Sequence, residues 1–130
     1  MKIQIEVSEK QAQIILEALD LYSRLGMGQM EKVDNLRSLL SRANIDDRRE
    51  RRELLEKLKK LYFPELSRNE YYGIFGDKTP EESKIAYDLI QVLRNKIAYH
   101  KHPEGGITVD FGTPLKSSKT EELCECNIVE

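Results

Sequence analysis

The sequence predicts an α+β fold, in which several helices pack on a small antiparallel sheet with N- and C-terminal strands. The first observation is that Ile3, Ile5 and Val7 alternate with polar residues, as in a half-buried strand. The second is a similar alternation at residues 107–111 and, more weakly, at residues 123–129. The third is a set of long intervening segments whose apolar residues recur with the period of an amphipathic helix.

Composition points to one domain spanning residues 1–130, with 34% charged and 39% hydrophobic residues. The core of such a chain is modest, so we expect a second copy to complete it in a homodimer or higher homo-oligomer. A net charge of -2 gives no global reason to bind DNA, and any anion site must be a local cationic pocket.

We expect no membrane segment and no signal peptide, because no apolar run has the required length. Two cysteines without a secretory signal predict a reducing, cytoplasmic location.

The first helix is expected to follow the N-terminal strand directly. Ser8 and Gln11 fit a capping box, and the helix should run to about Leu25. Its predicted buried stripe comprises Ile14, Ile15, Ala18, Leu19, Tyr22 and Leu25. The glycines of Gly26-Met27-Gly28 should break it, and a second helix is predicted from Gln29 to about Ala43.

A highly charged helix is predicted next. Residues 46–60 hold seven cations and five anions, which favours a solvated helix with i,i+4 pairs such as Glu53 with Lys57. A cationic rim for a phosphate ligand is the alternative. The predicted inner face comprises Leu54, Leu55, Leu58 and Leu61, and Phe63-Pro64 should close the helix.

A loop and a long helix follow. Residues 67–80 contain two glycines and three aromatic residues, which either cover the core locally or form a stacking platform for a base. Thr79 is the expected N-cap and Pro80 the first position of a helix that ends at His102, before Pro103. Its predicted buried face comprises Ala86, Leu89, Ile90, Leu93 and Ile97. Seven-residue spacing places Tyr87, Arg94 and Lys101 in one stripe beside that face.

The side chains near this stripe suggest a phosphate or nucleotide pocket. Arginine suits bidentate phosphate recognition, asparagine can read a base or ribose edge, and an aromatic ring can stack on adenine. We expect no cofactor and no metal in it. The candidate ligand-binding residues are Arg24, Tyr71, Tyr72, Phe75, Arg94, Asn95, His100 and Lys101.

Two other chemistries are weighed against this pocket. Arg94 and His100 fit the arginine–spacer–histidine signature of the HEPN ribonuclease superfamily, in which the resemblance implies attack on an RNA phosphodiester. A helix-edge arginine and a helix-end histidine stabilised by the helix dipole explain the same residues more simply. The four side chains of His100, His102, Cys124 and Cys126 are plausible zinc ligands, but neither pair has the C-x-x-C spacing of common zinc sites.

Four collinear stretches resemble a family of small phage-encoded proteins: Ala18–Gln29, Tyr72–Ile74, Ala86–Arg94 and Pro103–Phe111. This family is similar to the first-described phage anti-Thoeris sponges, which sequester cyclic ADP-ribose isomers made by bacterial TIR proteins. Some sponges also hold cyclic oligonucleotides made by CBASS enzymes. In such relatives an aspartate often stands at the position of His100, which counts against the HEPN interpretation.

The resemblance implies an α+β homodimer or higher homo-oligomer, with ligand pockets at subunit junctions and no turnover of the ligand. It predicts a protein that blocks host defence in the cytoplasm of the infected bacterium by capturing a cyclic nucleotide signal. The alternatives are a HEPN-like ribonuclease that uses Arg94 and His100, and a phage interaction protein without a small ligand.

Overall fold

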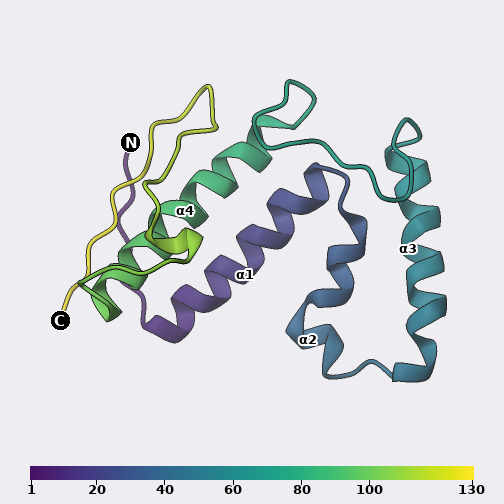
Figure 1. The fold of residues 1–130 in the computed structure, drawn as a ribbon, viewed down its shortest axis with the longest axis horizontal. Helices are drawn as coiled ribbons and strands as arrows, with labels where there is room; N and C mark the ends of the chain where they lie inside the picture. The colour runs from purple at the N-terminus through teal and green to yellow at the C-terminus, as the bar shows by residue number, and fades with distance from the viewer.

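The computed structural model describes residues 1–130 and contains helices and turns but no β-strand (Figure 1). The predicted α+β class, with its small antiparallel sheet, is therefore wrong. The α-helices are α1 (Glu9–Gly26), α2 (Arg37–Leu40), α3 (Arg48–Tyr62) and α4 (Glu81–Lys101). Three short 3₁₀ helices are η1 (Met30–Asn35), η2 (Ile45–Asp47) and η3 (Val109–Phe111).

Helix α1 begins and ends as predicted. The Gln11 amide donates to Ser8 Oγ at 3.2 Å, and the Ser8 amide donates to Gln11 Oε1 at 2.8 Å, which completes the capping box. At the other end, Gly28 adopts a φ of 89°, a conformation that favours glycine. The chain therefore leaves the helix at Gly26-Met27-Gly28.

Helices α1 and α4 pack side by side in opposite directions and form the centre of the molecule (Figure 1). Ser23 Oγ donates to the Ser83 carbonyl at 2.8 Å near one end of the pair, and Lys101 contacts Glu9 at the other. A Cβ added at Gly26 would lie 1.9 Å from Ser83 Oγ. A larger residue at this position would force the Ser83 side chain to move, so glycine favours the close approach of the two helices.

The predicted buried stripe of α1 is wrong, because a different side of the helix packs inward. The buried residues are Ala12, Leu16 and Ser23, whereas Ile14 and Tyr22 are 62% and 54% exposed. Apolar residues occur on more than one side of this helix, so their period does not select a face. Ser23 and Gly26, which lie against Ser83 of α4, are on the side that packs inward.

Helix α4 largely follows its prediction. Ala86 and Ile90 are buried in its predicted face, and the helix ends at Lys101 with His102 as C-cap. Its start differs, because Pro80 is the N-cap residue and Thr79 does not cap the helix. The Thr79 hydroxyl instead donates to the Gly73 carbonyl at 2.5 Å, which closes the preceding loop.

The predicted second helix is interrupted. Leu36, with an extended backbone, separates η1 from α2, and the Arg37 amide donates to Glu17 Oε1 at 3.0 Å. This contact with α1 lies twenty residues away in sequence and was not apparent from local spacing.

Helix α3 occupies the predicted charged segment but turns a different face inward. Leu54, Leu58 and Leu61 are exposed, while Lys59 is buried and donates to the carbonyls of Arg68 and Glu70. The predicted pair of Glu53 with Lys57 is not formed, because Glu53 pairs with Arg49. The helix contacts η1 rather than a sheet.

None of the three predicted strands forms. Residues 2–7 and 123–129 are extended without pairing partners, and the Ile107–Phe111 stretch turns into η3. Alternation predicts which side chains share a face, but a strand also needs a neighbour to accept its backbone hydrogen bonds. In this chain the side chains of α4 bind the segment after Gly106 instead.

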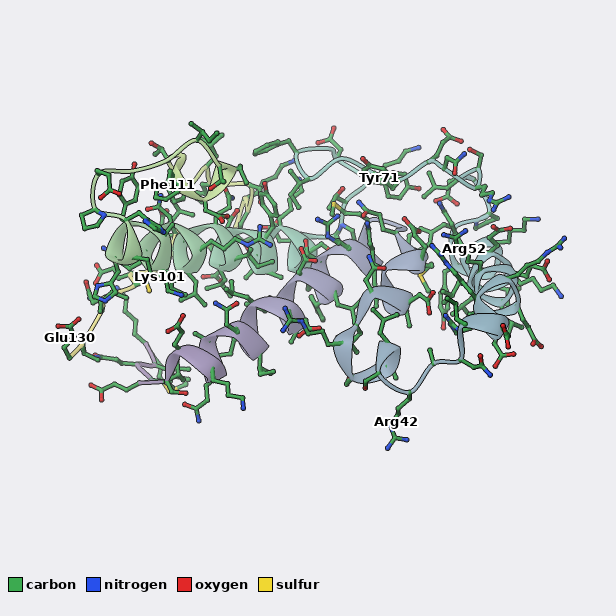
Figure 2. All side chains as sticks on the ribbon, turned by 60° about the horizontal axis from the view of Figure 1, so that its bottom comes forward. Arg42, Arg52, Tyr71, Lys101, Phe111 and Glu130 are labelled. Carbon is green, nitrogen blue, oxygen red and sulfur yellow. The ribbon has the colours of Figure 1, made fainter.

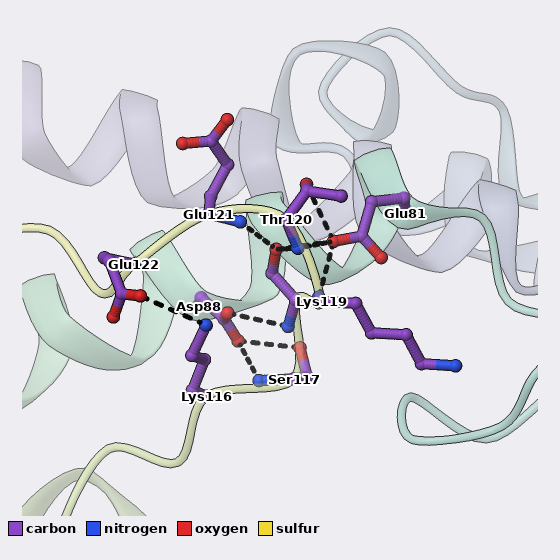
Figure 3. A network of polar contacts seen from close by, with 9 residues as sticks. Glu81, Asp88, Lys116, Ser117, Lys119, Thr120, Glu121 and Glu122 are labelled. Atoms are coloured by element: carbon purple, nitrogen blue, oxygen red, sulfur yellow. Dashed lines mark hydrogen bonds and ion pairs between the residues drawn. The ribbon is translucent and has the colours of Figure 1, made fainter.

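Residues 115–120, here called the strap, run along α4 (Figure 3). The Asp88 carboxylate is buried and accepts hydrogen bonds from both amides and one hydroxyl of Ser117 and Ser118. The Glu81 carboxylate accepts from Ser118 Oγ, from the Lys119 amide and from the amide and hydroxyl of Thr120. Two carboxylates on one helix thus attach the strap through its main chain.

No helix has both the length and the apolar character needed to cross a membrane.

Candidate functional site

A groove of about 380 Å³ lies between α1, the last turns of α4 and the segment that contains η3. This volume falls in the range of small-molecule sites. The groove is lined by Gln13, Leu16, Arg94, Ile97, Ala98, Lys101, His102, Thr108, Asp110 and Phe111. Two cations, one carboxylate and one phenyl ring therefore face the same space.

Arg94 is the cation of the groove that is free to bind a ligand. Its guanidinium makes no hydrogen bond and no ion pair with any other residue of residues 1–130, although the side chain is half-buried. Arginine presents a planar fork of donors that matches the oxygens of a phosphate. Arg94 is thus placed to form charge-assisted hydrogen bonds without first breaking an internal contact.

Lys101 lies seven residues after Arg94 on the same side of α4 and also lines the groove. Its ammonium contacts the Glu9 carboxylate at the start of α1. This hydrogen bond, together with the charge of the ammonium, holds the pKa of Glu9 below its ordinary value. A ligand phosphate would compete with Glu9 for Lys101, whereas Arg94 has no competing partner within the chain.

Asn95 shapes one wall of the groove. Its side-chain amide donates to the Asp110 carbonyl at 3.1 Å and to the Gly112 carbonyl at 2.9 Å. The Tyr99 hydroxyl donates to the Phe111 carbonyl at 3.1 Å, and the two rings meet edge to face with centroids 5.2 Å apart. These contacts fix η3 against α4, so Asn95 positions the wall and has no free donor for a ligand.

Two further predicted site residues lie outside the groove. His100 Nε2 is 3.3 Å from a Glu130 carboxylate oxygen at the end of the chain. Arg24 lies fifteen residues after Glu9 on α1, about 22 Å along the helix axis. There the Arg24 guanidinium binds Asp20 at 2.9 Å and Gln29 Oε1 at 2.9 Å, in a structural role.

The predicted aromatic platform also lies elsewhere. Figure 2 shows Tyr71 far from Lys101 and Phe111, over the part of the molecule near α3. The Tyr72 hydroxyl donates to the Glu65 carboxylate, which raises the pKa of Tyr72, and its ring meets Phe63 edge to face. Tyr71 and Phe75 are exposed. This loop therefore does not share a site with Arg94.

The residues that sequence reasoning missed come mainly from the segment after Gly106. Thr108, Asp110 and Phe111 line one groove although they would not all share one face of a strand. Gln13 and Leu16 were missed because the face of α1 that meets α4 was not identified. Asparagine at position 95, four residues before Tyr99, was the available signal for a captured loop, since both carry hydrogen-bond donors on one helical face.

The ribonuclease and zinc interpretations can both be compared with the positions of their side chains. Arg94 faces the groove while His100 does not, so one chain does not bring the two HEPN-type side chains together. No group of three or more His, Cys, Asp or Glu side chains is arranged to hold a metal ion. Cys124 is exposed, and partial desolvation together with the neighbouring Cys126 raises the pKa of its thiol.

The side chains that line the groove have the chemistry of a site for a small anion with hydroxyl groups and a flat ring. Arg94 and Lys101 suit phosphate oxygens, and the Asp110 carboxylate suits a ribose hydroxyl or an exocyclic amine. Phe111 provides an aromatic surface beside them.

No protein-family model, no curated protein and no solved structure matches this chain.

Proposed function

We propose that this is a phage anti-defence protein that binds and sequesters cyclic nucleotide immune signals without cleaving them. The ligands would be cyclic ADP-ribose isomers or cyclic oligonucleotides, captured in the cytoplasm of the infected host. The observation that carries the proposal is the unpaired Arg94 guanidinium in a groove that it shares with Lys101 and Phe111.

The physical requirements of capture fit this groove. Tight binding of a phosphate-bearing ring needs several charge-assisted hydrogen bonds in a partly desolvated pocket and needs no catalytic group. Leu16, Ile97 and Phe111 supply the apolar surface around the two cations.

The first experiment separates capture from catalysis. The protein is incubated with cyclic ADP-ribose isomers, cyclic oligonucleotides or RNA, then repurified and denatured, and the released material is analysed. We expect intact cyclic nucleotide. Cleaved nucleotide, or RNA degradation that depends on Arg94 and His100, would replace this proposal with the ribonuclease alternative.

The second experiment addresses Arg94. Arg94→Ala should weaken cyclic nucleotide binding roughly ten- to hundredfold, which corresponds to the loss of about 1.5–3 kcal/mol from a charge-assisted hydrogen bond. Arg94→Lys should fall between, because lysine keeps the charge and loses the planar fork. Isothermal titration calorimetry measures both dissociation constants.

The matched control is Lys96→Ala. Lys96 is exposed on the same helix, does not line the groove and makes no ion pair, so its removal changes the net charge equally. Equal losses of affinity in Lys96→Ala and Arg94→Ala would show a non-specific charge effect and would contradict the assignment of the groove.

A further inference from the structure

The N-terminal arm, residues 1–7, has no regular secondary structure and no partner segment. Its main chain makes no hydrogen bond to the rest of the chain. Ile3 and Ile5 are 78% and 68% exposed, and Val7 is also exposed. Unpaired N–H and C=O groups beside a row of apolar side chains form a template for pairing with another strand.

The sequence of the arm is complementary to itself. In an antiparallel pair centred on Gln4, Lys2 lies opposite Glu6 of the other copy, Ile3 lies opposite Ile5, and Gln4 lies opposite Gln4. Lys2, Gln4 and Glu6 then share one face, and Met1, Ile3, Ile5 and Val7 share the other. Only this register places both lysines opposite glutamates, so charge complementarity selects it.

We propose that the N-terminal arm pairs with the arm of a second copy in an antiparallel two-stranded ribbon, with a two-fold axis at Gln4. The proposal names the surface for the oligomerisation that is part of the proposed function. A two-fold axis explains why one short segment carries both members of each complementary pair, since an isologous interface uses the same residues twice.

The start of α1 holds the arm in position for this pairing. The capping box at Ser8 and Gln11 fixes the direction in which the arm leaves the helix. Glu9 in turn contacts Lys101 at the groove. Glu9 is five residues from Gln4, so an extended arm places the groove about 17 Å from the axis. Because the two arms run antiparallel, the grooves of the two copies then lie at opposite ends of the ribbon, about 34 Å apart along it.

Cysteine cross-linking tests the register in the full-length chain, with Cys124→Ser and Cys126→Ser as background. Gln4→Cys should form a disulfide-linked dimer under mild oxidation, because residues at the axis face each other at about 5 Å between Cα atoms. Lys2→Cys alone should not cross-link, because the two copies of residue 2 would be about 14 Å apart. A mixture of Lys2→Cys and Glu6→Cys proteins should form the mixed dimer.

Charge reversal tests the complementarity independently of any disulfide. Lys2→Glu should raise the dimer dissociation constant about tenfold, since it places like charges opposite each other twice. The double variant Lys2→Glu/Glu6→Lys should restore the original value. Lys10→Glu is the matched control, because Lys10 lies beyond the arm on α1.

A monomeric intact chain, equal cross-linking of Gln4→Cys and Lys2→Cys, or a dimer that persists when residues 1–7 are removed would each overturn the proposal. Pairing of the arm with residues 123–129 would leave Gln4→Cys uncross-linked and would overturn it as well. Arg94-dependent nucleotide binding is measured on the same samples, so loss of the ribbon and loss of the proposed function are distinguishable.

Discussion

Asn95 and Arg94 are neighbours on α4, yet the structure gives them opposite roles. Arg94 is half-buried without a partner and faces the groove. The side-chain amide of Asn95 instead donates hydrogen bonds to two carbonyls of the segment around η3. A single residue along a helix turns the side chain by about 100°, which is enough to separate a ligand contact from a structural one.

Replacement of Asn95 should therefore affect folding first. Asn95→Ala should lower the free energy of unfolding by about 1 kcal/mol, because two carbonyls of the η3 segment lose their donor. Asn95→Asp should do no better, since a carboxylate cannot donate to a carbonyl. Urea denaturation measures the change, with Lys96→Ala as the reference. Unchanged stability combined with lost nucleotide affinity would instead make Asn95 a direct ligand contact.

For the predicted site residues, spacing along one helix predicted which side chains lie together. The sequence did not predict which residues of different elements lie close to each other. Arg94 and Lys101 line the same groove because seven-residue spacing on α4 is a local property. Arg24, Tyr71, Tyr72 and Phe75 belong to elements whose relative placement depends on packing, and they lie outside the groove. The face of α1 that meets α4 was unpredictable for the same reason.

At the scale of elements, the strap shows how a segment without regular structure is held. Its main-chain amides donate to Glu81 and Asp88, and Gln91 makes two further bonds with the main chain of Leu115. The hydrogen bond from Ser118, with those from Thr120 and Lys119, lowers the pKa of Glu81 from 4.5 to about 2.

The low pKa of Glu81 predicts how stability changes in acid. Because the folded-state pKa lies below the unfolded value of 4.5, Glu81 contributes stability above that value and loses it as the pH falls toward about 2. Glu81→Gln should be less stable near neutral pH and should show a smaller loss of stability over this interval. Urea denaturation at several pH values measures the difference.

Glu82→Gln provides the control for this experiment. Glu82 lies in the same first turn of α4 but is exposed and makes no ion pair, so its replacement should leave the acid dependence almost unchanged. Identical pH profiles for Glu81→Gln and the unmutated protein would show that the strap does not depend on the Glu81 charge.

The helices were predictable and the sheet was not. The capping box at Ser8 and the glycines after Leu25 are local signals, and both ends of α1 follow them. Alternation at Ile107–Phe111 is equally local, but Asn95 and Tyr99 capture this stretch as a turn. A strand is defined by its neighbour, and none of the three predicted strands pairs with another segment of the chain.

At the scale of the whole molecule, much apolar surface remains exposed. The buried apolar core comprises only Ala12, Leu16, Met27, Met30, Ala86 and Ile90, while Ile3, Ile5 and Leu61 are among many exposed large side chains. A single copy therefore leaves surface that a second copy can cover.

The mass in solution should reflect this exposure. Light scattering at micromolar concentration should give at least twice the chain mass of 15.1 kDa. Raising the salt concentration should affect the equilibrium only partly, because apolar contacts do not weaken with ionic screening. A mass equal to one chain at this concentration would contradict the expected assembly.

The pairing of α1 with α4 has a consequence during protein synthesis. The contacts between Ser23 and Ser83, and between Glu9 and Lys101, join residues 60 and 92 positions apart. At about 5–20 residues per second, a ribosome needs about 4–15 s to add residues 27–101 after α1 is complete. For that interval Leu16 and its neighbours lack the helix that buries them, so newly made chains are most exposed to chaperones and proteases before α4 emerges.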